Sequence, residues 1–260
     1  MSITFRNFRI TILLIILAVV SLNTWLGIKR TTDWDHPLWI VIYPLNGDGS
    51  KLSAERISRL SVKEFTPISR FMQREAKRHG IAIERPVTLH LADEVTTPPP
   101  ATPAVDENPL LIALWSLKMR WWAWRVDTYQ GPRADIRLFI EYYAHGDHQG
   151  PLENSFGLQK SRISVSRAFA ARSMRSRNLV VITHELLHTL GATDKYDFAT
   201  LLAQYPQGFA DPDKKPLYPQ NRAEIMAGRI PLSEERVKMP ASLKSCMVGA
   251  VTAKEIGWSM

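Results

Sequence analysis

The longest uncharged run of the chain is also its most apolar, and it extends from Ile10 to Ile28. Nineteen residues are just enough to cross the apolar core of a bilayer as a helix. Arg6 and Arg9 precede the run, and Lys29 and Arg30 follow it. We therefore expect residues 1–30 to form an uncleaved signal anchor, with a transmembrane helix over about 10–28, ahead of a folded domain of residues 31–260.

Two alternatives to this anchor stay open. A cleavable signal peptide normally has a shorter apolar stretch and an A-x-A-like cleavage site, which Val19 and Ser21 only approximate. A buried helix of the folded domain is the other alternative. The flanking charges nearly balance and do not fix the orientation by themselves. A short N-terminus before a large domain is typical of a domain outside the cytoplasm, and cleavage would give a secreted protein.

Beyond the anchor, short β-rich segments alternate with helical patterns. The first strand is expected over 38–46, where "LWIVIYPLN" precedes the turn-forming "NGDGS". A helical pattern over 53–79 is interrupted near Pro67 and stopped by Gly80. Further strands are expected over 85–94, 134–145 and 161–170. This alternation predicts an α/β or α+β domain.

A helix rich in tryptophan is expected over 110–126, after an exposed loop rich in Pro and Thr. Tryptophan interleaved with Lys118, Arg120 and Arg125 is typical of a helix at a membrane interface. The alternative, which we favour, is that an apolar stripe packs against the sheet while the cations face water. That stripe consists of Leu110, Leu114, Leu117, Trp121 and Trp124.

Charge and cysteine content narrow the possible partners. The net charge is +8 and the pI about 9.7, which suits anionic surroundings such as phospholipid headgroups. No nucleic-acid-binding module is recognisable, so we expect no nucleic-acid partner. The one cysteine, Cys246, excludes a disulfide within the chain and a thiolate zinc site, and a lone cysteine is most often buried. The sequence carries no signal for an oligomeric state.

The segment "HELLHTLGATDKYD", residues 184–197, carries the chemistry. In a helix capped at Asn178, His184 and His188 lie one turn apart on one face and can both reach one metal ion. Glu185 can then sit beside the metal rather than on it. The apolar side of this helix comprises Leu179, Ile182, Leu186 and Leu190.

A catalytic zinc ion is held by three protein ligands and keeps its fourth position open for water. A third ligand is therefore needed beside the two histidines. Gly191 is placed to end the helix, so the chain can turn sharply and return Asp194 to the metal. Glu224, in "NRAEIM", is the alternative third ligand. His145 and His148 could bind a second metal, but two solvent-exposed histidines are the simpler interpretation.

These residues resemble the metzincin zinc peptidases in their H-E-x-x-H-x-x-G-x-x-D form, as in snapalysin-type enzymes. Tyr196 occupies the place of a tyrosine that often follows the aspartate in that form. "AEIMAG", residues 223–228, is similar to the Met-turn of the family, with Met226 as its methionine. Other metzincins often have a tyrosine two residues later, where this chain has Gly228.

The resemblance covers about residues 184–228 and implies a zincin fold: a twisted sheet, an active-site helix and a small C-terminal subdomain closed by the helix in "VTAKEIGW". It also implies a bound Zn²⁺ and hydrolysis of peptide bonds in peptides or proteins, with Glu185 as general base for a zinc-activated water. Two other functions stay open. One is a non-catalytic zinc-binding module tethered to the membrane, and the other is hydrolysis of another amide, such as a cell-wall peptide.

Overall fold

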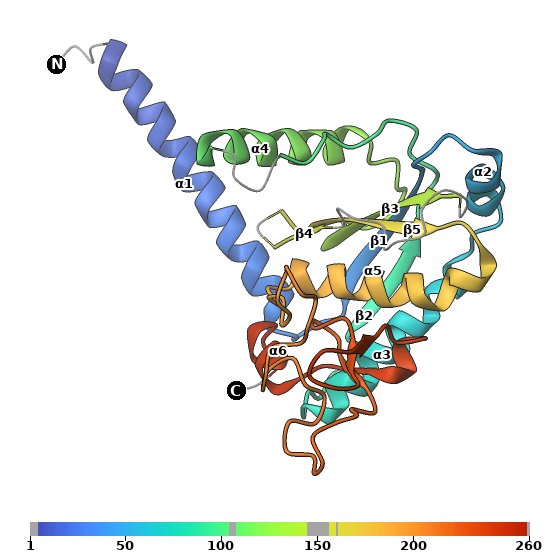
Figure 1. Cartoon of the computed structure of the whole chain (residues 1–260). Helices are drawn as coiled ribbons and strands as arrows, with labels where there is room; N and C mark the ends of the chain where they lie inside the picture. Colours follow the sequence, from blue (N-terminus) through green and yellow to red (C-terminus); the bar gives the residue numbers. More distant parts are fainter. Residues whose placement is uncertain (1–4, 104–107, 145–155, 160, 259–260) are drawn as a thin grey trace.

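The computed structural model describes residues 5–103, 108–144, 156–159 and 161–258. Its centre is a five-stranded sheet in the order β2-β1-β3-β5-β4 (Figure 1). Four strands are parallel, and β4 joins one edge antiparallel to β5. The strands are β1 (Leu38–Asn46), β2 (Val87–Leu91), β3 (Ile136–Tyr143), β4 (Phe156–Leu158) and β5 (Ile163–Phe169). The architecture is therefore mixed α/β.

Helices cover both faces of the sheet (Figure 1). On one face lie α3 (Thr66–Arg78) and α5 (Arg175–Thr189), and on the other lies α4 (Pro109–Arg125). The helix α2 (Lys51–Ser58) and a 3₁₀ turn (Val62–Phe65) precede α3. This layering explains why β1 is apolar at successive positions: Ile40 and Ile42 enter one core cluster, and Val41 and Tyr43 enter the other.

The chain after α5 forms a small C-terminal subdomain on the side of α5 that faces away from the sheet (Figure 1). It contains two short strand pairs, a 3₁₀ turn and a closing helix, so most of it is irregular. Its elements are β6 (Ala223–Glu224) paired with β9 (Cys246–Met247), β7 (Ile230–Pro231) paired with β8 (Val237–Lys238), the turn Leu243–Ser245, and α6 (Ala250–Glu255). Cys246 is buried there, as expected.

Most of the predicted elements are present, with two corrections around the active-site segment. The strand β4 has no counterpart among the predicted strands. Helix α5 begins at Arg175, after a 3₁₀ turn over Arg172–Met174, so Asn178 is not its N-cap. The Asn178 side chain instead bonds the backbone of Phe169 twice, at 3.2 Å to the N–H and 2.8 Å to the carbonyl. It ties α5 to the end of β5.

The predicted packing of α4 is wrong. The stripe expected to face the sheet points outward: Leu110 is 72% exposed and Trp124 70% exposed. The opposite face packs on the sheet instead, through Met119, Trp122 and Ala123. Because α4 is apolar on both faces, periodicity alone did not identify the buried one.

Helix α1 (Phe5–Thr32) projects away from the domain (Figure 1). Its segment Asn7–Thr32 is long and apolar enough to cross a membrane, and only 6% of its most apolar window is buried. That exposure contradicts the alternative of a buried domain helix and leaves a membrane span or a signal sequence. Its C-terminal end contacts the domain, where Gly27 and Thr31 are buried and Arg30 lies 3.5 Å from Asp135.

Glu75, fully buried on α3, joins this helix to the C-terminal subdomain. Its carboxylate accepts hydrogen bonds from Arg74 (2.8 Å), Arg78 (2.7 Å) and the N–H of Val248 (3.0 Å). Burial acts to raise the pKa of Glu75, but these bonds outweigh it and hold the pKa below its usual value. The ionised carboxylate therefore stabilises the folded state.

We expect the Glu75→Gln variant to lose about 2–3 kcal/mol of unfolding free energy at neutral pH, since both arginines are partly exposed and screened. The contribution is complete above the ordinary pKa of glutamate and is lost as the pH falls through the lower pKa of the folded state. Urea unfolding in detergent should show that the difference in unfolding free energy between the variant and the natural chain becomes smaller in acid. Glu55→Gln, in an exposed pair, serves as the control. A gap independent of pH would contradict this account.

Candidate metal centre

Helix α5 ends where the sequence motif requires a turn. Gly191 has φ +107°, a left-handed conformation that other residues adopt only with strain. The N–H of Gly191 bonds the carbonyl of His188, and the N–H of Ala192 bonds that of Leu187. This pair of bonds is a Schellman motif, and it reverses the chain directly after the second histidine. Asp194 consequently returns toward the helix.

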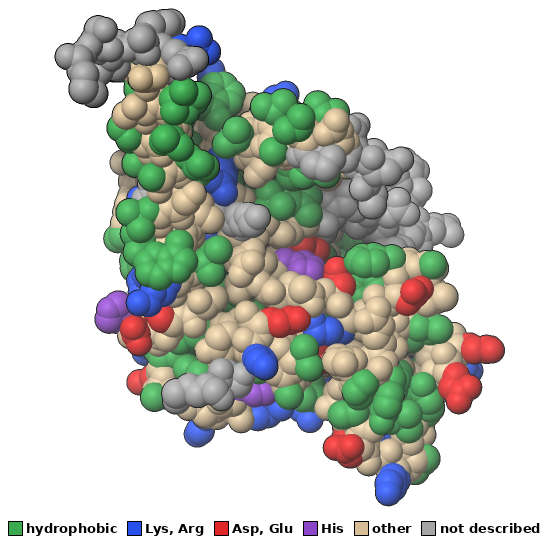
Figure 2. All heavy atoms as spheres, turned by 90° about the vertical axis from the view of Figure 1, so that its left-hand side faces the viewer, with side chains coloured by type: hydrophobic (Ala, Val, Ile, Leu, Met, Phe, Trp, Pro, Cys, Tyr) green, Lys and Arg blue, Asp and Glu red, His purple; other side chains and the backbone are tan. Residues whose placement is uncertain are grey.

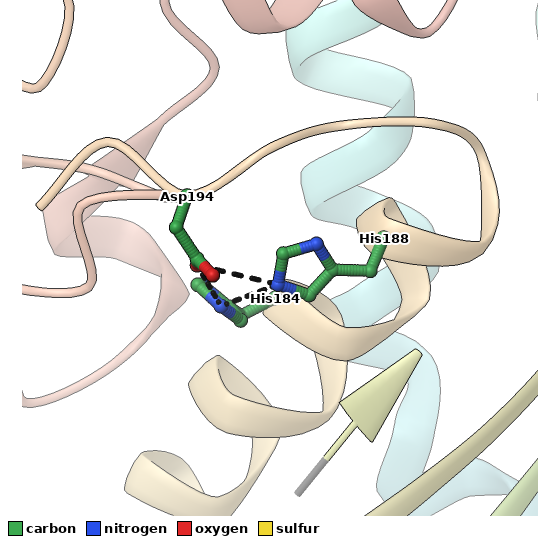
Figure 3. A group of neighbouring side chains, drawn as sticks. All are labelled: His184, His188 and Asp194. Atoms are coloured by element: carbon green, nitrogen blue, oxygen red, sulfur yellow. Dashed lines mark hydrogen bonds and ion pairs between the residues drawn. The ribbon is translucent and has the colours of Figure 1, made fainter. Parts of the chain in front are cut away.

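His184, His188 and Asp194 meet beside the last turns of α5 (Figure 3). One potential ligand atom from each lies within 4.8 Å of the others. The two Nε2 atoms are 3.1 Å apart, and Oδ1 of Asp194 lies 3.0 Å from the first and 3.3 Å from the second. Despite these short contacts, Oδ1 is buried without a well-oriented hydrogen bond within the described structure. Three ligand atoms thus surround one point, as a single cation requires.

Both imidazole rings are held through their other nitrogen. Nδ1 of His184 lies 3.0 Å from the carbonyl of Ile225, and Nδ1 of His188 lies 2.8 Å from the carbonyl of Ala192. A carbonyl only accepts, so each Nδ1 carries the proton and donates it, which leaves Nε2 for the metal. These two carbonyls are functional groups that sequence analysis missed, because no side chain marks them.

The charges around the three candidate ligands favour positive charge at their centre. Burial acts to lower the pKa of His184, but contact with Asp194 and the charges of Glu185 and Asp194 raise it to about 9. Burial acts to raise the pKa of Asp194, but the two histidines outweigh it and hold that pKa well below its usual range. The site therefore attracts positive charge, which fits a divalent metal ion.

Glu185 is buried next to this centre. Burial raises the pKa of its carboxyl, partly offset by the charges of His184 and His188. Its Oε2 is buried and has no hydrogen-bond partner within the part of the chain that the structure describes. A buried carboxylate oxygen without a partner is costly in a folded protein, and such groups concentrate at functional sites.

Glu224, the alternative third ligand, has a different set of partners. Its fully buried carboxylate accepts hydrogen bonds from the N–H groups of Met226 (2.6 Å), Ala227 (3.0 Å) and Gly249 (3.0 Å). The hydroxyl of Thr252 donates a fourth, at 2.8 Å. These bonds shape the turn over 224–228 and leave the carboxylate outside the group of three.

The turn over 224–228 contacts both parts of the candidate site. Ile225 supplies the carbonyl next to His184, and the carbonyl of Met226 accepts a hydrogen bond from the N–H of Lys195. Met226 is fully buried. Its role as the methionine of a Met-turn, which the resemblance implies, remains a prediction.

The residues after Asp194 depart from expectation at one position. A lysine on a loop ordinarily points to solvent, but Lys195 is buried, and its Nζ lies 2.8 Å from Oε2 of Glu255 on α6. It therefore fastens the ligand loop to the closing helix. Tyr196 lies near the site, with its ring centroid 6.4 Å from that of His184. Burial and the charges of Asp194 and Glu185 raise the pKa of Tyr196 to about 12, so its hydroxyl stays protonated.

Gly157 on β4 allows the edge strand to lie against α5. A Cβ at this position would come within 2.4 Å of the Glu185 carbonyl and 2.6 Å of the His188 Cβ. Gly157→Ala should therefore displace β4 or the helix and cost about 1–3 kcal/mol of unfolding free energy. It should also reduce zinc affinity, measured by competition with a chelating dye. Gly49→Ala, where φ is +68° and a Cβ meets nothing within 4 Å, adds backbone strain without a contact, so it should lose stability but keep its zinc affinity.

The possible second metal site at His145 and His148 lies outside the described residues.

Comparison with known proteins gives only distant likeness. No family model and no curated protein matches the chain. Among solved structures, wild-type OgpA from Akkermansia muciniphila is similar over 86% of this chain, with 14% identity and a TM-score of 0.39. Catalytically inactive OgpA in complex with an O-glycopeptide substrate, glycodrosocin, gives 13% identity and a TM-score of 0.40 over the same share. The chain covers 62% of the length of each OgpA structure.

Proposed function

We propose that this protein is a zinc-dependent peptidase anchored to a membrane by α1, with its catalytic domain on the extracytoplasmic side. The observation that supports the proposal most is the convergence of His184, His188 and Asp194 on one point, beside Oε2 of Glu185, which has no hydrogen-bond partner among the described residues. Two histidines and a carboxylate form a known catalytic zinc set. A purely structural site has no use for the extra carboxylate.

Three side chains would hold the metal ion, and Glu185 would transfer the proton. His184 and His188 present Nε2 because their Nδ1 atoms are bonded to carbonyls, and Asp194 presents its carboxylate from the loop. A bound zinc ion would supply Lewis acidity, which makes a water molecule more acidic and polarises the substrate carbonyl. Glu185 accepts the proton of the attacking water and returns it to the leaving amine.

The β4 edge of the sheet supports a peptide as substrate. Among the described strands, β4 is the last on its side, so one row of its backbone groups has no strand partner there, and it packs against α5. An extended peptide can pair with such an edge, which would hold its backbone next to the histidines. We expect the long irregular segment between Asp194 and Met226 to form the other side of the peptide-binding site.

The test is cleavage of a proteome-derived peptide library by the full chain in detergent, with new N-termini identified by mass spectrometry. An O-glycosylated peptide is included, because OgpA has been crystallised with one. We expect cleavage that a chelator removes and zinc restores. Zinc binding without any cleavage would favour the non-catalytic module. Cleavage of isolated cell-wall peptides alone would favour the other hydrolase.

A further inference from the structure

Helix α4 is apolar on two opposite faces, and only one of them is covered. Met119, Trp122 and Ala123 are buried on the sheet. The outward face carries five large side chains that are each more than half exposed: Leu110, Leu114, Leu117, Trp121 and Trp124. A helix that is apolar all round is normally enclosed in a core or by lipid, so the outward face calls for an apolar partner.

Two of the three cations of α4, Lys118 and Arg125, lie along one margin of that face. At 100° per residue, Lys118 and Arg125 both project beside Leu114 and Trp121. Both are exposed, and the guanidinium of Arg125 lies 5.3 Å from the centroid of the Trp121 ring. Tryptophan at the level of lipid headgroups, with Lys and Arg reaching phosphates, is the composition of interfacial helices.

The same end of the molecule carries the candidate membrane span. Figure 2 shows hydrophobic side chains on the projecting α1 and across the adjoining upper end, where Figure 1 places α4. A bilayer that takes up α1 would therefore meet α4 as well. The net charge of +8 adds attraction to anionic headgroups.

We propose that the outward face of α4 docks on the bilayer, as a second membrane contact of the domain beside α1. The Leu and Trp side chains enter the headgroup and upper acyl region, and Lys118 and Arg125 contact lipid phosphates. Since α4 and α5 cover opposite faces of the sheet, this contact leaves the candidate metal centre facing water. The domain is thereby held in one orientation instead of turning freely on its anchor.

Spin labels on the full chain in vesicles test this contact. Single cysteines replace Leu114 or Leu117 on α4, Leu14 on α1, and Val62 on the far side of the domain, each of them exposed. Native Cys246 is fully buried and stays in place. Collision rates with oxygen, which partitions into lipid, and with a water-soluble nickel complex are compared in detergent-free vesicles of phosphatidylcholine, with and without phosphatidylglycerol.

On both α4 labels we expect several-fold fewer collisions with nickel and more with oxygen than at Val62, with a larger shift in anionic vesicles. Nickel accessibility at Leu114 and Leu117 equal to that at Val62, while Leu14 is protected, overturns the proposal. Spin–spin broadening between α4 labels that vanishes on dilution with unlabelled protein would show a second copy on this face and overturns it too. If protein does not associate with vesicles at all, both membrane contacts are refuted.

Discussion

The Glu185→Gln variant will fold and bind zinc like the natural chain, but it will hydrolyse peptides about 100- to 10,000-fold more slowly. Glutamine keeps the shape of the side chain and cannot accept the proton of water. Oε2 of Glu185 makes no hydrogen bond to His184, His188 or Asp194. The substitution therefore removes no described support of these ligands. Peptide turnover and zinc content, measured on the same preparation, test the prediction.

The control for this variant is Glu234→Gln, an exposed carboxylate outside the ligand trio. It should keep full activity. If Glu185→Gln kept full activity as well, Glu185 would not be the general base. If it lost zinc along with activity, Glu185 would support the metal rather than the proton transfer.

The Asp194→Ala variant will bind zinc at least about 100-fold more weakly, since loss of a group that merely orients a ligand already costs about 10- to 100-fold. The alanine also leaves two buried histidines without the carboxylate that they contact at 3.0 and 3.3 Å. Zinc affinity is measured by competition with a chelating dye. Circular dichroism reports whether the domain still folds.

Asp197→Ala is the matched control for the ligand assignment, because it lies on the same loop and outside the ligand trio. Its carboxylate braces the loop through Ala199 and Thr200. It should keep most of its zinc affinity. Equal losses in the two variants would mean that loop shape, and not ligation by Asp194, controls metal binding. Unchanged affinity in Asp194→Ala would refute the ligand assignment outright.

Local patterns in the sequence were sufficient to predict much of this candidate site. The i, i+4 spacing places His184 and His188 on one face of any helix, and a glycine after the second histidine is a strong stop signal. Both inferences need only near neighbours. The carbonyls of Ile225 and Ala192, and the small size required of Gly157, depend on how distant or irregular segments meet. No residue type in the sequence indicates either the carbonyl contacts or the close approach at Gly157.

The errors arose where two explanations fitted the same residues. Asn178 is a good cap residue, but its side chain is used by the end of β5, so α5 begins one turn earlier. Lys195 follows a loop ligand and would ordinarily be solvated, yet Glu255 on a helix sixty residues away pairs with it. On α4, the apolar stripe expected in the core lies outward, because the face that is buried is equally apolar.

The most direct test of the proposed function is a titration of metal and activity together. The full chain is stripped with a chelator and returned to zinc in steps, and bound zinc per chain and peptide hydrolysis are measured at each step. We expect activity to rise in proportion to occupancy and to saturate at one zinc per chain. Full peptide hydrolysis by the stripped protein, or one bound zinc with no hydrolysis of any peptide in the library, would contradict a zinc peptidase.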